Sequence, residues 1–251
     1  MRFSSKPPVV VAAALLLGLM AATPVVALDD IDVIDDAASA TQPAVRRMNA
    51  TQTQEPPPPP QPQSVQYRVT LVLDWTASTH PSTVPPSAHI SPTVIASHSQ
   101  VGDLFVAGAL ASNGIEQMAE TGGTSLLRTE LSGDPTVTGV RVGSRIDDAG
   151  QESFTVTLTQ EASMVSLVTM LAPSPDWFVG IRDQPMFVDG VWVDDVSRDL
   201  SNYDAGTDNG TDWQSANFDT DPAQVISGPR DASFAAAVAE NPFARVVIER
   251  L

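Results

Sequence analysis

The sequence contains no cysteine, and this absence removes several kinds of site at once. Disulfide bonds, iron–sulfur clusters, thiolate zinc sites and cysteine nucleophiles are all excluded. A folded domain of this chain must therefore be held by its apolar core, aided at most by a metal ion. Hydrophobic residues make up 42% of the chain, a fraction typical of globular rather than disordered proteins.

Basic residues are also scarce, since 13 Lys and Arg stand against 30 Asp and Glu, and Lys6 is the only lysine. The formal net charge of −17 repels phosphate backbones and anionic headgroups, so nucleic acid is excluded as a partner. A divalent cation, or a partner presented through one, is favoured instead. The alternative is that most of these acids only keep the protein dissolved.

Long apolar runs are limited to residues 9–22, a stretch too short to span a bilayer. Arg2 and Lys6 precede it and Val25-Val26-Ala27 follows it as a small-residue cleavage site, so residues 1–27 are predicted to be a secretory signal peptide. An uncleaved membrane anchor is the alternative. No other segment approaches transmembrane length, so we expect no membrane span in the mature chain.

Residues 28–64 have the composition of a disordered spacer that is first acidic and then rich in proline. The run Pro56–Pro60 favours polyproline II and cannot join a sheet, because proline lacks a backbone donor. We therefore expect the folded domain to occupy residues 65–251.

From Val65 to Leu73 apolar residues alternate with mostly polar ones, which predicts a half-buried strand. Turn-rich clusters of Gly, Pro, Asp and Asn separate the further β-rich runs. These runs cover residues 137–142, 154–158, 164–171, 177–181 and 245–248. Short helices are predicted only at residues 114–120 and 233–240, and the prolines of residues 76–100 predict a long irregular loop. The predicted fold class is all-β, an antiparallel β-sandwich with long loops and little helix.

An acidic cluster in the last third of the chain contains Asp176, Asp204 and Asp208. Carboxylates in tight turns suit a hard cation such as Ca²⁺, and Gly206 would let the backbone fold sharply between the last two. The spacing does not match an EF-hand, because Asn209 stands where that loop needs glycine. Plain turn formation is the alternative interpretation of the same residues.

His80, His89 and His98 are the only histidines, and three imidazoles could form a zinc site. Their presence, together with the aspartates, keeps open a secreted metal-dependent hydrolase as an alternative function. No His-Glu-x-x-His pattern and no Gly-x-Ser-x-Gly elbow is present, so no motif selects a catalytic residue. Hydrogen bonding of the histidines to loop backbone is the favoured interpretation.

The chain from about Ser64 to Leu251 resembles the spondin domain family. The resemblance is strongest in Ala172-Pro173-Ser174-Pro175-Asp176-Trp177-Phe178-Val179-Gly180 and in Tyr203-Asp204-Ala205-Gly206-Thr207-Asp208-Asn209-Gly210. Shorter matches occur, in the family's order, at residues 67–75, 79–81, 88–92, 96–99, 108–114 and 244–250.

The resemblance implies a β-sandwich that holds calcium in loops at one end. The family's calcium carboxylates match Asp176, Asp204 and Asp208, and Asp199 lies in a matching stretch as a candidate for the outer coordination sphere. It also implies a non-enzymatic recognition or adhesion module that binds an extracellular or cell-surface protein or glycan. Animal members carry cysteines that are absent here, which puts in doubt any transfer of partner identity.

The expected location is secreted and extracellular, or the periplasm or cell envelope if the source is bacterial. A structural component of an envelope or matrix, with no discrete ligand, is a third interpretation of the same sequence.

Overall fold

The computed structural model describes residues 60–251, and the predicted signal peptide 1–27 and most of the predicted spacer 28–64 lie outside this range. The alternation from Val65 to Leu73 forms β1 (Ser64–Asp74), whose odd-numbered apolar side chains are buried and whose even-numbered side chains face outward. β1 is the centre of a four-stranded antiparallel sheet in the order β11-β13-β1-β6. The other strands are β6 (Ala149–Thr159), β11 (Asp195–Asp199) and β13 (Ala244–Arg250).

A second antiparallel sheet packs against the first and is organised around β7 (Met164–Ala172). β7 pairs with β8 on one side and with β2 and β3 on the other. The remaining strands are β2 (His89–Ile90), β3 (Val94–His98), β4 (Val137–Val142), β5 (Ile146–Asp147), β8 (Trp177–Pro185) and β12 (Ser201–Asp204). A separate two-stranded ribbon consists of β9 (Phe187–Val188) and β10 (Val191–Trp192).

The main core lies between the two sheets and includes the inward face of β1, with Tyr67, Val69 and Leu71 fully buried. The predicted antiparallel β-sandwich is therefore confirmed, and each predicted β-rich run lies within a strand. The predicted helices at residues 114–120 and 233–240 correspond to α1 (Asn113–Thr121) and α3 (Ala232–Glu240).

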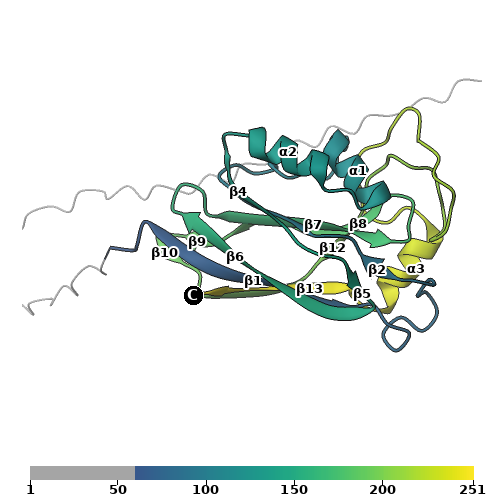
Figure 1. The fold of residues 1–251 in the computed structure, drawn as a ribbon, viewed down its shortest axis with the longest axis horizontal. Coiled ribbons are helices and arrows are strands. Elements are labelled where there is room, and N and C mark those ends of the chain that lie inside the picture. The colour runs from purple at the N-terminus through teal and green to yellow at the C-terminus, as the bar shows by residue number, and fades with distance from the viewer. Residues whose placement is uncertain (1–59) are drawn as a thin grey trace, which may run out of the picture. The chain divides into compact units, whose positions relative to one another are not determined.

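A second core covers the other face of the larger sheet, where α1 and α2 (Ser125–Gly133) pack, as Figure 1 shows. Val94, Val168 and Phe178 from the sheet meet Ile115 and Leu127 from the helices. Because β7 is buried on both faces, it is a nearly continuous apolar run rather than an alternating one.

Several elements lie outside the predicted helices and β-rich runs, namely α2 and the strands β2, β3, β5, β9, β10, β11 and β12. Among them, β2 and the fully buried strand β3 lie in the predicted irregular loop of residues 76–100. Within residues 60–251, no helix has the length and apolar character needed to cross a membrane.

Candidate functional site

Strand pairing brings the aspartates of the two best-preserved motifs together. Asp204, the last residue of β12, pairs with Trp177, the first residue of β8, and the amide of Ala205 donates to the carbonyl of Asp176 at 3.1 Å. Asp176, Asp204 and Asp208, here called the aspartate cluster, are exposed by only 0%, 4% and 7%. The structure therefore places all three predicted residues at one end of the larger sheet.

The Asp176 carboxylate is satisfied on one side only. Its Oδ2 accepts hydrogen bonds from the amides of Thr207 (2.8 Å) and Asp208 (3.2 Å). Its Oδ1 is buried and has no hydrogen-bond partner among the residues that the structure describes. Because an unpaired buried carboxylate oxygen is costly, this atom is the clearest sign that the cluster suits a cation.

The other two aspartates close tight turns in the same loop. Oδ1 of Asp204 accepts from the amide of Gly206 at 2.9 Å, and Oδ1 of Asp208 accepts from the amide of Gly210 at 2.6 Å. Oδ2 of Asp208 also accepts from the amide of Phe218 at 2.8 Å. Both i to i+2 bonds are Asx turns, so turn formation is one role that these residues fulfil.

Gly206 allows the sharp fold between these turns, as predicted. Its φ is 77°, a left-handed value that favours glycine, and an added Cβ would lie 2.5 Å from the carbonyl oxygen of Gln224. The loop is thereby pressed against the segment that follows it, where Gln224 donates its amide to Gly206.

Burial and mutual repulsion raise the pKa values of two of these carboxylates. Desolvation, followed by the charge of Asp176, raises the pKa of Asp204 to about 7, although Arg230 acts in the opposite direction. Desolvation also raises the pKa of Asp176, against the lowering effect of the Thr207 and Asp208 amides. The positive charge of a cation beside both groups would favour their ionised forms and so oppose these shifts.

Two further residues belong to the site but were not predicted. Arg230 forms a salt bridge with Oδ1 of Asp204 and also donates to the carbonyl of Val225. Glu120 of α1 interacts with the side chain of Thr207, and its Oε1 is buried without a partner in the described part of the chain. Desolvation raises the pKa of Glu120, and the charges of Glu116 and Asp208 add to this effect.

As arranged here, the described residues contain no group of three or more His, Asp or Glu side chains that could hold a metal ion by themselves. Calcium takes six to eight oxygen ligands, however, and accepts main-chain carbonyls and water beside carboxylates. Two neighbouring carboxylates, one of which keeps a buried oxygen without a partner among the described residues, therefore fit a hard cation better than a transition metal, which prefers nitrogen and sulfur ligands.

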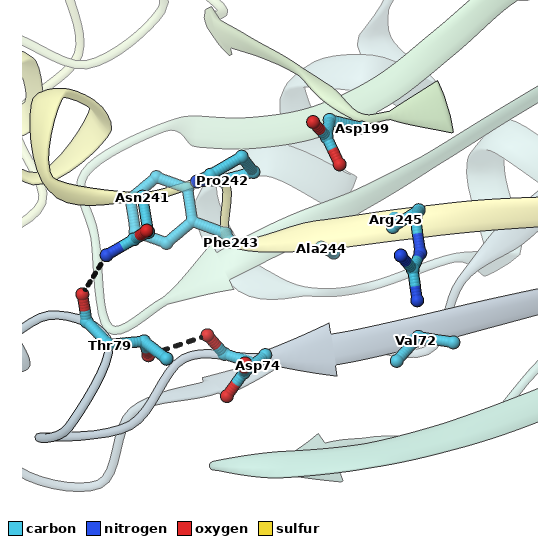
Figure 2. Close-up of a pocket in the computed structure, with 9 residues that line it drawn as sticks. All are labelled: Val72, Asp74, Thr79, Asp199, Asn241, Pro242, Phe243, Ala244 and Arg245. Carbon is cyan, nitrogen blue, oxygen red and sulfur yellow. Dashed lines mark hydrogen bonds between the residues drawn. The ribbon is translucent and has the colours of Figure 1, made fainter. Parts of the chain in front are cut away.

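The structure does not bring Asp199 to the aspartate cluster. Asp199 ends β11 in the other sheet, opposite Arg245 of β13, and lines a depression of about 220 Å³ shown in Figure 2. Asp74 and Thr79 form the opposite wall, where the Thr79 hydroxyl donates to the carbonyl of Asp74 at 2.9 Å. No polar atom there is both buried and unpaired among the described side chains, so the depression lacks the feature that distinguishes the aspartate cluster.

The three histidines lie apart. His89 and His98 pair with Ala172 and Met164 of β7, positions separated by roughly 26 Å at the usual rise of a strand. His80 stacks on Phe243 at a centroid distance of 4.8 Å, and its two ring nitrogens contact Thr79 Oγ1 and the carbonyl of Asn241. The proposed zinc site of three imidazoles is therefore not formed, whereas hydrogen bonding to loop residues is observed.

His98 does form one arrangement that resembles a catalytic triad. Its Nε2 lies 2.8 Å from Ser166 Oγ, and its Nδ1 lies 3.5 Å from Asp103 Oδ2 and 2.7 Å from the carbonyl of Gln100. Ser166 and His98 are both fully buried, and Ser166 Oγ already accepts from the amide of Asp183. A substrate could not reach the hydroxyl, so these residues connect β3, β7 and β8 rather than support hydrolysis.

Comparison with known proteins gives a consistent result. Residues 65–245 match the family described as Spondin_N. Spondin-1 of Rattus norvegicus is 31% identical over 207 residues, which cover 75% of this chain and 25% of that protein. Spondin-2 of Homo sapiens is 30% identical over 203 residues, which cover 74% of this chain and 61% of that protein. The matched region is thus about a quarter of the length of Spondin-1.

Proposed function

Because the chain belongs to the spondin family, we propose that it is a calcium-binding recognition or adhesion module that acts outside the cell and is not an enzyme. The predicted signal peptide supports an extracellular location. The proposed partner is an extracellular or cell-surface protein or glycan, because the acidic chain is unsuited to nucleic acid.

The observation that carries the calcium proposal is the unpaired, buried Oδ1 of Asp176. Asp176 and Asp204 would supply carboxylate oxygens, and Asp208 would hold the loop that positions them. The ion would supply positive charge where burial and repulsion now disfavour two ionised groups. Its effect would be to fix the loop that follows β12 against the start of β8, and so to present a defined surface.

Thermal unfolding of the purified chain tests this proposal, first in excess EDTA and then with calcium restored, with magnesium as the control ion. Calcium at about one hundred times its dissociation constant would stabilise the folded state by about 2.7 kcal/mol, or about 5–10 °C in melting temperature. Magnesium is expected to act weakly, because it demands near-octahedral geometry.

Asp176→Asn is the informative variant. It keeps the shape of the side chain and removes its charge, so we expect a higher melting temperature than wild type in EDTA and no rise with calcium. Asp195→Asn, at an exposed position of β11, is the matched control and should respond to calcium as wild type does. An equal calcium-induced rise in Asp176→Asn and wild type would show that the aspartates are turn formers only.

The metal-dependent hydrolase is not supported by any specific observation in residues 60–251. The histidines lie apart, and the one Ser–His–Asp arrangement is closed to substrate.

A further inference from the structure

A second feature lies away from the aspartate cluster, between α2 and the loop of residues 99–112. The loop and the helix enclose a groove of about 390 Å³, here called the α2 groove. Its floor is apolar and belongs to the second core, with Leu104, Ile115, Leu127 and Leu131 at most 4% exposed. The groove therefore opens directly onto packed hydrophobic side chains.

One side of the α2 groove is a ridge of exposed apolar residues, Val106, Leu110 and Val225. Val106 and Leu110 line the groove and are exposed by 45% and 61%. Leu110 forms a β-bridge with Val225, which is 43% exposed and extends the ridge beyond the groove. Contiguous exposed apolar residues of this kind mark interaction surfaces more often than scattered ones do.

The loop that carries the ridge is held in place by hydrogen bonds. The amide of Gly108 donates to the carbonyl of Ile226 at 2.8 Å, and the amide of Ile226 donates to the carbonyl of Ala109 at 2.8 Å. The amide of Gly102 donates to Oδ1 of Asp183 at 2.9 Å. A partner would therefore meet a preformed surface and lose less conformational entropy on binding.

The rim of the α2 groove is acidic. Asp103, Glu130 and Asp134 line it, and no basic side chain does so among the described residues. Hydrogen bonds from the Thr136 side chain and amide lower the pKa of Asp134, so it is ionised at neutral pH. Arg182 is the base packed beside the groove, 5.7 Å from the ring centroid of Phe105, and Asp183 follows it.

From this apolar floor, exposed ridge and acidic rim, we propose that the α2 groove docks a protein segment that combines apolar side chains with Arg or Lys. A second copy of this chain is disfavoured as the occupant, because it would bring a net charge of −17 to an acidic rim. This inference refines the proposed recognition role by naming a partner class, but the groove does not depend on the calcium site.

The test is a binding titration of the full chain with a fluorescent eight-residue peptide that alternates arginine and leucine. We expect saturable binding that weakens as salt is raised, since exposed charge pairs are screened. Replacing the arginines with glutamate, or the leucines with serine, should each weaken binding at least roughly tenfold. If the glutamate peptide bound as tightly as the arginine peptide, the proposed basic character of the partner would be wrong. The absence of saturable binding of the first peptide would overturn the proposal.

Variants of the chain locate the binding. Val106→Ser combined with Leu110→Ser should weaken the affinity for the peptide roughly tenfold. Val188→Ser, at a valine of matching exposure on the β9–β10 ribbon, should leave this affinity unchanged. Asp134→Asn should reduce the salt dependence of peptide binding. It serves as a second variant if the double variant folds poorly. Wild-type affinity in both would overturn the assignment to this groove.

The same titration in EDTA and in calcium separates this proposal from the previous one. Peptide binding without any calcium-induced thermal shift would support the α2 groove and reject the calcium site. A calcium-induced thermal shift without peptide binding would support the calcium site and reject the α2 groove.

Discussion

At the residue scale, Asp204 should make the stability of the metal-free protein depend on pH. Its pKa of about 7 in the folded chain exceeds the value of about 3.9 for an unfolded aspartate. Between these values the folded state retains a proton that the unfolded state has released, so the stabilising contribution is present at low pH and is lost as pH rises towards 7. We expect the free energy of unfolding in EDTA to fall over this range.

Urea denaturation in EDTA at a series of pH values measures this effect, with Asp204→Asn as the variant. The fall of the unfolding free energy with pH should become shallower in the variant but should not vanish, because burial also raises the pKa values of Asp176 and Glu120. Asp195→Asn should reproduce the wild-type slope. A wild-type slope in Asp204→Asn would contradict the assignment of the titration to Asp204.

How far the site could be predicted depends on whether its residues belong to local motifs. Asp176, Asp204 and Asp208 stand in two motifs with recognisable sequence, and the structure brings them together. Glu120 and Arg230 join them only through the packing of α1 and the return of the chain after the loop. Neither has a sequence signal, because a lone glutamate on a short helix and a lone arginine in a loop are common on protein surfaces.

At the element scale, one carboxylate joins α2 to the start of α1. Glu130 of α2 accepts from the amide of Gly114 at 2.8 Å and from the hydroxyl of Ser112 at 2.7 Å, where Ser112 is the N-cap of α1. Glu130→Ala would leave these donors unpaired, and we expect a loss of about 1–3 kcal/mol in the free energy of unfolding.

Chemical denaturation measures this loss. Glu130→Gln retains an acceptor oxygen and should cost less than the alanine variant, while Glu161→Ala, at an exposed turn, should change stability by at most about 0.5 kcal/mol. Equal stability of Glu130→Ala and Glu161→Ala would show that the carboxylate does not join the helices.

Two of the elements that the sequence did not predict, β3 and α2, share a physical cause. β3 is buried on both faces, so its residues have no alternating pattern, and the prolines around it favour a loop. α2 is a short helix that follows Gly122 and Gly123 and ends at Gly133, with only Leu127 and Leu131 buried. Both elements are fixed by tertiary packing in the second core, which local sequence preferences do not report.

At the scale of the whole domain, an aromatic cluster closes the end of the sandwich beside the aspartate cluster. Phe234 of α3 stacks on Trp177 at a centroid distance of 4.6 Å, and Trp213 packs edge-on to Trp177 at 4.7 Å. Trp177 follows Asp176 directly and begins β8, so the packing of α3 and the position of the buried carboxylate are linked through one residue.

Phe234→Ala should therefore affect stability and metal binding together. Removing a fully buried phenylalanine costs about 3–5 kcal/mol, and the resulting cavity would loosen Trp177 and the backbone of Asp176. We expect a lower melting temperature in EDTA and a weaker apparent affinity for calcium by thermal titration. Phe218→Ala, at a side chain that is 63% exposed, should alter neither quantity by much. A destabilised Phe234→Ala protein that binds calcium with wild-type affinity would show that the loop holds the aspartates without support from the aromatic cluster.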